Sequence, residues 1–99
     1  MEMKFSTSDL KRLAEEASFE GGFPTEVVLK YRLRLQMIAA AIDERAFYAL
    51  KSLHFEKLKG KRSHQRSMRL DNSWRLVVEI EKGSPKNTIC IIGIENHYE

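Results

Sequence analysis

The sequence has little of the chemistry that disulfides and metal centres require. Its one cysteine, Cys90, has no partner for an internal disulfide, and His54, His64 and His97 are not spaced like metal ligands. Glycine-rich phosphate loops and Cys-x-x-Cys pairs are also absent. We therefore expect no metal, no cofactor and a reducing compartment, and any chemistry would be acid–base work.

Long apolar runs are missing as well. The stretch Met1–Phe5 lacks the apolar core of a signal peptide, and no uncharged run approaches the roughly 20 residues that a membrane helix needs. The chain has 99 residues, of which 42% are hydrophobic and 31% are charged, and this is the composition of an ordinary globular domain. We expect one domain over residues 1–99, in the cytoplasm and away from membranes.

Charge is distributed unevenly along the chain. Residues 1–50 hold seven basic and eight acidic residues, whereas residues 51–99 hold ten basic and six acidic ones. Six of those basic residues fall between Lys57 and Arg69, with no acid among them. This basic segment, residues 57–69, predicts an anion-binding half, with a solvated surface loop as the plainer alternative.

The first half has the pattern of a strand followed by helices. Residues 1–6 alternate like a short strand, and residues 6–9 form a cap cluster for a first helix that ends before residues 21–24. A second helix starts at Thr25, and its apolar stripe is expected to enter the core through Val28, Tyr31, Leu35, Ile38 and Ile42. A third, short helical stretch from residue 43 is expected to bury Ala46, Phe47, Leu50 and Leu53.

The second half changes to a period of two, which is typical of strands. We expect strands over residues 65–70, 74–81 and 88–94, and the last should be central because it is apolar on both faces. The predicted fold class is α+β, in which an N-terminal strand and a helical hairpin pack on an antiparallel sheet.

Eight residues could carry acid–base chemistry: Glu56, Lys59, Arg66, Arg69, Arg75, Glu95, His97 and Tyr98. Arg75 interrupts an otherwise apolar strand, either to bind an anion or to reach solvent. Glu56 and Lys59 could instead form a helix-surface ion pair, and His97 and Tyr98 could be a solvated or packed tail. The residues alone indicate a small basic α+β domain that could bind RNA.

Three motifs in order resemble the HigB, or killer protein, toxins of the RelE/ParE superfamily in bacterial type II toxin–antitoxin systems. They are Phe-Glu-Lys-Leu-Lys-Gly at 55–60, Gln-Arg-Ser-Met-Arg-Leu-Asp-Asn-Ser-Trp-Arg-Leu at 65–76 and Ile-Glu-Asn-His-Tyr at 94–98. The expected fold is therefore RelE-like. The resemblance implies a ribosome-dependent mRNA endoribonuclease that uses the RNA's own 2′-hydroxyl as nucleophile, works without metal and leaves a 2′,3′-cyclic phosphate.

The resemblance also implies roles for the candidate residues. Glu56 matches a general-base carboxylate of the YoeB-like branch, where it either acts as the base or orients Lys59. Lys59 matches the lysine of the Leu-Lys-Gly element, and Arg75 matches the arginine that clamps the scissile phosphate. At the tail, His97-Tyr98 resembles the YoeB-like His-Tyr pair, whereas typical HigB chains end in Asp-Tyr-His, so either His97 or Tyr98 is the acid.

The implied partners are a HigA-like helix-turn-helix antitoxin, the ribosome and mRNA. RNA-binding residues are expected along the basic segment, at Lys57, Lys61, Arg62, Arg66 and Arg69. Two alternatives stay open: a ParE-like toxin that inhibits DNA gyrase without nuclease activity, and a non-catalytic relative that binds RNA or protein.

Overall fold

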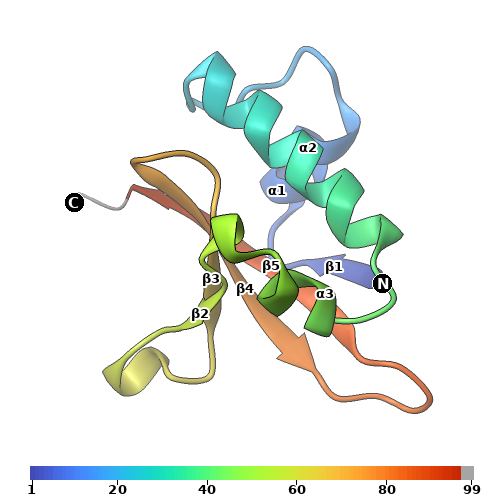
Figure 1. Ribbon diagram of the computed structural model, residues 1–99. Coiled ribbons are helices and arrows are strands. Elements are labelled where there is room, and N and C mark those ends of the chain that lie inside the picture. Colours follow the sequence, from blue (N-terminus) through green and yellow to red (C-terminus); the bar gives the residue numbers. More distant parts are fainter. Residues whose placement is uncertain (97–99) are drawn as a thin grey trace.

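The chain folds into one mixed sheet with helices packed against it. The computed structural model describes residues 1–96 (Figure 1). In chain order the elements are β1 (Glu2–Phe5), α1 (Ser8–Glu15), α2 (Thr25–Ala40), α3 (Arg45–Ala49), the 3-10 turn η1 (Lys51–Leu53), β2 (Glu56–Lys57), the 3-10 turn η2 (Gly60–Arg62), β3 (Arg66–Arg69), β4 (Trp74–Glu81) and β5 (Thr88–Asn96).

The sheet has the strand order β1-β5-β4-β3-β2. Every neighbouring pair is antiparallel except β1 and β5, which are parallel. The predicted α+β class is therefore confirmed, and the N-terminal strand joins the sheet as its parallel edge. The strand predicted at 88–94 is interior as expected, because β1 and β4 flank it, and it continues to Asn96.

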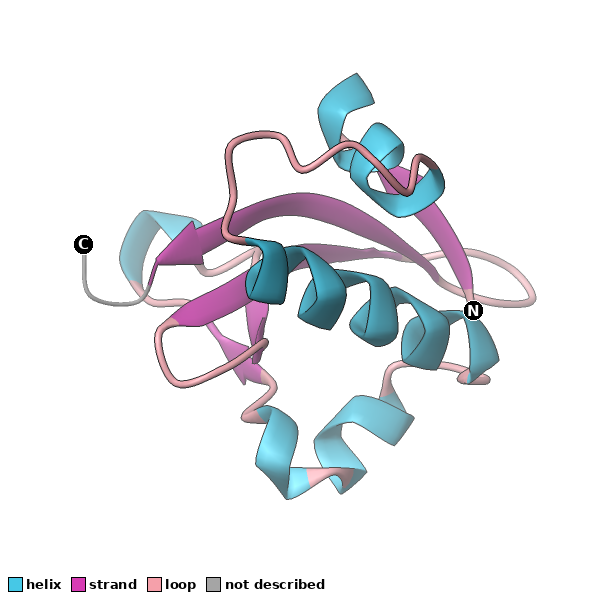
Figure 2. Ribbon diagram, turned by 90° about the horizontal axis from the view of Figure 1, so that it is seen from above, coloured by secondary structure: helices cyan, strands magenta, loops and turns pink. Residues whose placement is uncertain are grey.

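Helices α1 and α2 cover one face of the sheet and leave the other face open (Figures 1 and 2). The core forms between these helices and the sheet face that they cover, and it contains 17 buried hydrophobic residues. Eight of them have no exposed surface: Tyr31, Ile38, Phe47, Met68, Leu76, Val78, Ile89 and Ile91. Within residues 1–96, no helix is both long and apolar enough to span a bilayer.

A β-bulge in β5 decides which side chains reach this core. Val77 pairs with Gly93 and Val78 pairs with Ile91, so Ile92 has no partner across the strand pair. The extra residue reverses the alternation along β5, and both Ile91 and Ile94 are buried although they are three positions apart. Past the bulge, Glu95 pairs with Arg75 and lies on the open face.

Two expectations about the helical half are wrong. Ile42 is 73% exposed, because α2 ends at Ala40 and the extended Ala41 takes the chain out of the helical period. Leu50 is 48% exposed and Ala46 is also exposed, because α3 is a single short turn that directs only Phe47 inward, with Leu53 following from η1.

The contact between α1 and α2 depends on two polar side chains of α2. The buried Tyr31 hydroxyl donates a hydrogen bond to the Leu10 carbonyl at 2.8 Å, and burial raises the pKa of Tyr31 well above its usual value. Arg32 donates to the carbonyls of Leu13 at 2.8 Å and Glu16 at 2.9 Å, which satisfies the free end of α1. These bonds hold the helical hairpin together.

Replacing Tyr31→Phe should lower the free energy of unfolding by about 1–3 kcal/mol, because the buried Leu10 carbonyl would lose its donor. Equilibrium urea unfolding measures the change. Tyr48→Phe is the matched control, since that hydroxyl accepts a solvent-exposed hydrogen bond from Arg66, whose loss should be close to neutral. Equal losses in both variants would contradict the assignment.

Candidate active site

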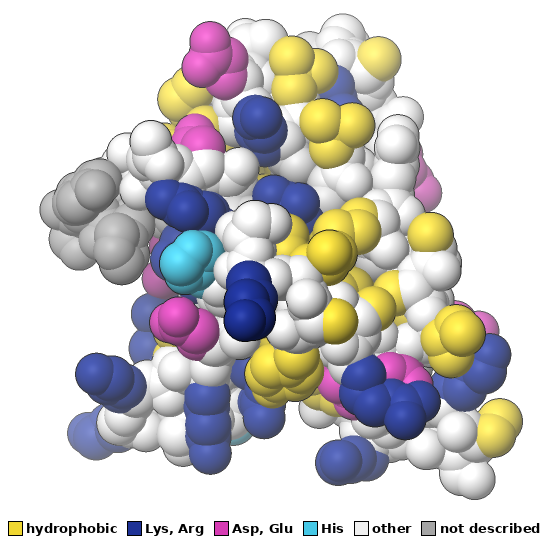
Figure 3. All heavy atoms as spheres, viewed as in Figure 1, with side chains coloured by type: hydrophobic (Ala, Val, Ile, Leu, Met, Phe, Trp, Pro, Cys, Tyr) yellow, Lys and Arg dark blue, Asp and Glu magenta, His cyan; other side chains and the backbone are white. Residues whose placement is uncertain are grey.

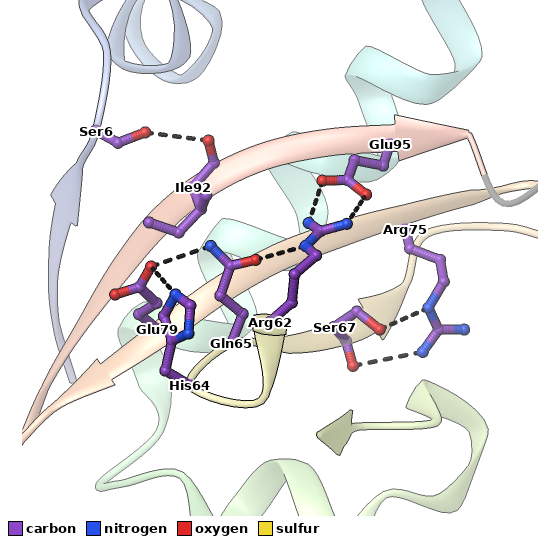
Figure 4. Close-up of polar contacts among 9 residues, drawn as sticks. All are labelled: Ser6, Arg62, His64, Gln65, Ser67, Arg75, Glu79, Ile92 and Glu95. Carbon is purple, nitrogen blue, oxygen red and sulfur yellow. Dashed lines mark hydrogen bonds and ion pairs between the residues drawn. The ribbon is translucent and has the colours of Figure 1, made fainter. Parts of the chain in front are cut away.

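Arg75 is held on the open face of the sheet by neutral partners (Figure 4). Its Nε donates to Ser67 Oγ at 2.7 Å, and its Nη2 donates to the Ser67 carbonyl at 3.4 Å. The same Nη2 also donates to the carbonyl of His54 at 2.6 Å. Ser67 is 2% exposed, so its side chain is buried where it meets the guanidinium. His54 takes a left-handed backbone conformation, with φ of 49°, at the turn that leads into Phe55. The third nitrogen of the guanidinium, Nη1, has no acceptor within the described residues.

The charge of Arg75 is not neutralised by an ion pair in the described part of the chain. Burial lowers the pKa of Arg75, while Glu56 raises it and Arg69 lowers it through their charges. Because the guanidinium pKa is ordinarily far above neutrality, Arg75 remains a cation. A partly buried cation with a free donor edge is suited to binding a phosphate oxygen.

Glu56 lies beside this cation on β2. It is directly opposite Ser67 in the strand pair, and its side chain is 67% exposed. The nearest recorded charge partner is His54, whose Nδ1 lies 4.0 Å from Glu56 Oε1. The carboxylate is therefore accessible for proton transfer. The alternative of a helix-surface ion pair between Glu56 and Lys59 is wrong, because this segment is not helical: Glu56 lies on β2 and Lys59 has an extended backbone.

The basic segment folds into a hairpin at the sheet edge, where Figure 3 shows lysine and arginine side chains gathered at the lower left. Lys59 and Lys61 are exposed at η2, and Lys57 is exposed opposite Arg66. Arg69 pairs with Arg75 across β3 and β4, and its Nη2 donates to Asn72 Oδ1 at 2.8 Å. Arg69 is thus the predicted RNA-binding residue nearest to Arg75 in the strand register.

Arg62 differs from the other predicted RNA-binding residues, because it is already paired. Its two terminal nitrogens donate to the two carboxylate oxygens of Glu95, at 3.0 and 2.5 Å, and its Nε donates to Gln65 Oε1 at 3.0 Å (Figure 4). Gln65 in turn donates to Glu79 Oε2 at 3.1 Å, and His64 lies 3.8 Å from the same oxygen. This chain of contacts ties the β2–β3 hairpin to the open face of β4 and β5.

The predicted tail residues His97 and Tyr98 lie outside the described residues. The chain reaches them through Glu95, which pairs with Arg75, and Asn96, which pairs with Trp74. In the described part of the chain, no three His, Cys, Asp or Glu side chains form a cluster that could hold a metal ion.

Two parts of the site had no signal in the sequence. Ser67 is an ordinary small residue within a predicted strand, and the contribution of His54 comes from its backbone carbonyl. Neither partner of Arg75 could be recognised from the sequence, because a backbone carbonyl is present at every residue and a serine eight residues away forms no motif with the arginine.

Together, the sheet order, the helical layer and the open face define the class of fold. A solved structure described as "YoeB/ParE toxin from Agrobacterium tumefaciens" is similar to this chain with a TM-score of 0.61 and 16% sequence identity, over 99% of this chain and 100% of that one. No protein-family model and no curated protein matches the sequence. The chain therefore has the RelE-like toxin fold that its motifs predicted.

The pair of Arg62 and Glu95 should stabilise the hairpin measurably. A double-mutant cycle of Arg62→Ala and Glu95→Ala is expected to give a favourable coupling of up to about 1 kcal/mol that falls as salt is raised, because the pair is bidentate but half-exposed. The singly bonded pair of Lys4 and Glu81 is the control and should show a smaller coupling. Urea unfolding measures both cycles, and a zero coupling for Arg62 and Glu95 would count against the tether.

Proposed function

We propose that this chain is the toxin of a type II toxin–antitoxin system and that it cleaves mRNA on the ribosome. The observation that carries the proposal is Arg75, a cation fixed by Ser67 and the His54 carbonyl with one donor edge free. The fold of a YoeB/ParE toxin supports it. Under this proposal the single domain, residues 1–99, acts in the cytoplasm and needs no cofactor.

The proposed reaction is an attack of the RNA's own 2′-oxygen on the adjacent phosphorus. The bond from the 2′-oxygen to phosphorus forms and the bond from phosphorus to the 5′-oxygen breaks, which leaves a 2′,3′-cyclic phosphate and a free 5′-hydroxyl. Glu56 accepts the proton of the 2′-hydroxyl, and His97 or Tyr98 donates a proton to the 5′-oxygen. Arg75 and Lys59 stabilise the additional negative charge on the phosphorane.

The proposed RNA partners follow from the charge of the surface. Lys57, Lys61, Arg66 and Arg69 supply cations for the backbone of mRNA or ribosomal RNA, and Arg62 acts through its pair with Glu95. A HigA-like antitoxin with a helix-turn-helix would keep the protein inactive. A ParE-like gyrase inhibitor is the second candidate, because the similar structure carries both names.

Arg75→Ala should reduce mRNA cleavage on translating ribosomes about 10²–10³-fold, because a cation that meets charge formed in the transition state is lost. Arg75→Lys should remain impaired, since lysine cannot bridge Ser67 and His54 with a planar donor fork. Single-turnover cleavage with end-group analysis of the product measures the effect, and circular dichroism verifies folding.

Arg45→Ala is the matched control for Arg75, because Arg45 is an exposed arginine at α3 whose partner is Asp43. It should cleave at the wild-type rate. Wild-type protein that leaves mRNA intact but inhibits gyrase supercoiling would replace the nuclease proposal with the ParE-like one.

The tail residues make a separate prediction. An acid must be protonated when the 5′-oxygen leaves, so cleavage should decline on the alkaline side as the His97 imidazolium loses its proton. His97→Gln should remove this limb together with most of the rate. If Tyr98→Phe is the damaging change and His97→Gln is nearly silent in a folded protein, Tyr98 is the acid. Rate profiles from pH 5 to 9 compare the two variants.

A further inference from the structure

Tyr48 is the only exposed aromatic residue among residues 1–96. Half of its side chain, 51%, is open to solvent, whereas the other aromatic rings of the described chain are buried or partly covered. It lies on α3, next to the strand edge formed by β2 and β3 (Figure 1). An exposed ring beside a charged strand edge is a feature that the proposed catalytic residues do not use.

The ring is fixed in position from two directions. It packs against Phe55 at a centroid distance of 4.7 Å and an angle of 72°, and Phe55 is itself buried against Phe47. Its hydroxyl accepts a hydrogen bond from Arg66 Nε at 2.8 Å. A ring held this way loses little freedom when a flat ligand stacks on it.

The surroundings of the ring are cationic. Arg66 stands opposite Lys57 in the pairing of β3 with β2, and neither residue forms an ion pair within the described chain. Arg66 is bonded to a neutral hydroxyl, so its full charge remains available to an anion. A flat aromatic surface with adjacent free cations matches one nucleotide unit, in which the base stacks and the phosphate meets the charge.

The segment of residues 54–56 connects this ring to Arg75. The carbonyl of His54 accepts the hydrogen bond from Arg75, and the ring of Phe55 packs against the ring of Tyr48. Successive side chains of an extended segment point to opposite faces, so Glu56 lies on the face of Arg75 while Phe55 lies on the face of Tyr48. Because β2 is the last strand of the sheet, a single strand of RNA can cross this edge and contact both faces.

We propose that Tyr48, with Lys57 and Arg66, is a stacking site for one unpaired base of the RNA strand close to the scissile phosphate. The inference rests on the proposed function, and it adds a base-binding residue that is not part of the catalytic set. Free cations on both sides of the edge favour RNA over a protein partner as the occupant.

The test uses hexanucleotides of 2′-O-methyl RNA, which cannot be cleaved because they lack the 2′-hydroxyl. One probe carries all six bases, and the others each lack a single base. Fluorescence anisotropy at low salt measures the dissociation constant of every probe with wild-type protein, Tyr48→Leu, Tyr48→Phe and Leu33→Ala. Leu33 is a matched control because it is a half-exposed apolar residue on α2.

Wild-type protein should bind about tenfold more weakly to the probe that lacks the stacked base. Tyr48→Leu should bind the complete probe about tenfold more weakly and lose its sensitivity at that one position, while Leu33→Ala keeps the wild-type profile. Tyr48→Phe should keep the positional sensitivity, because it retains the ring, but it loses the hydroxyl that Arg66 contacts. Urea unfolding checks that Tyr48→Leu is folded, and Tyr48→Phe tests the ring without its hydroxyl.

An equal loss for every probe with Tyr48→Leu, or no loss at all, would overturn the stacking site. Weaker binding of the antitoxin by Tyr48→Leu, with RNA binding unchanged, would also overturn it and assign the surface to a protein. The result is separable from the proposed function. If the positional effect is seen but mRNA on ribosomes stays intact, the stacking site is supported and the nuclease proposal is wrong. If mRNA is cleaved but no positional effect is seen, the nuclease proposal is supported and the stacking site is wrong.

Discussion

The bulge at Ile92 is the constraint on which the rest of the structure depends. In a regular strand, Ile94 would share the open face with Cys90 and Ile92, and Glu95 would enter the core. The extra residue exchanges these positions, so Ile94 is buried and Glu95 is available to Arg62. A single irregularity therefore sets both the packing of the core and the charge pattern of the open face.

The cations of this protein divide by the charge of their partners. Some are neutralised by carboxylates, as Arg62 is by Glu95 and Arg45 by Asp43. Others are held by neutral groups. This set comprises Arg32 with carbonyls of α1, Arg34 with the Arg69 carbonyl, Arg75 with Ser67 and the His54 carbonyl, Arg69 with Asn72 and the Asp71 carbonyl, and Arg66 with Tyr48. A neutral partner fixes the direction of a guanidinium and leaves its charge intact. Three of these arginines, Arg66, Arg69 and Arg75, lie on β3 and β4, where we propose that RNA binds.

A structural feature could be predicted from the sequence when the interactions that produce it lie within a few residues of one another. Strand β4 was predicted with its observed bounds because its alternation is a local signal. The start of the strand is also fixed locally, since the Asp71 carboxylate accepts hydrogen bonds from the backbone N–H groups of Ser73 and Trp74. The stripe of α2 was extended too far, to Ile42, because nothing in apolar spacing marks the extended Ala41. The charge run coincides with the β2–β3 hairpin, but it gave no sign that Arg62 is paired, because its partner Glu95 is 33 residues away. The roles of the site residues stay predictions.

The position of Glu95 bears directly on whether the open face can bind a phosphate. It pairs with Arg75 across β4 and β5, and an unengaged carboxylate there would compete with any anion for that guanidinium. Both of its oxygens instead accept hydrogen bonds from Arg62. Arg62 therefore engages the carboxylate that lies opposite Arg75, and Glu56, whose charge raises the pKa of Arg75, is the acidic side chain beside that guanidinium.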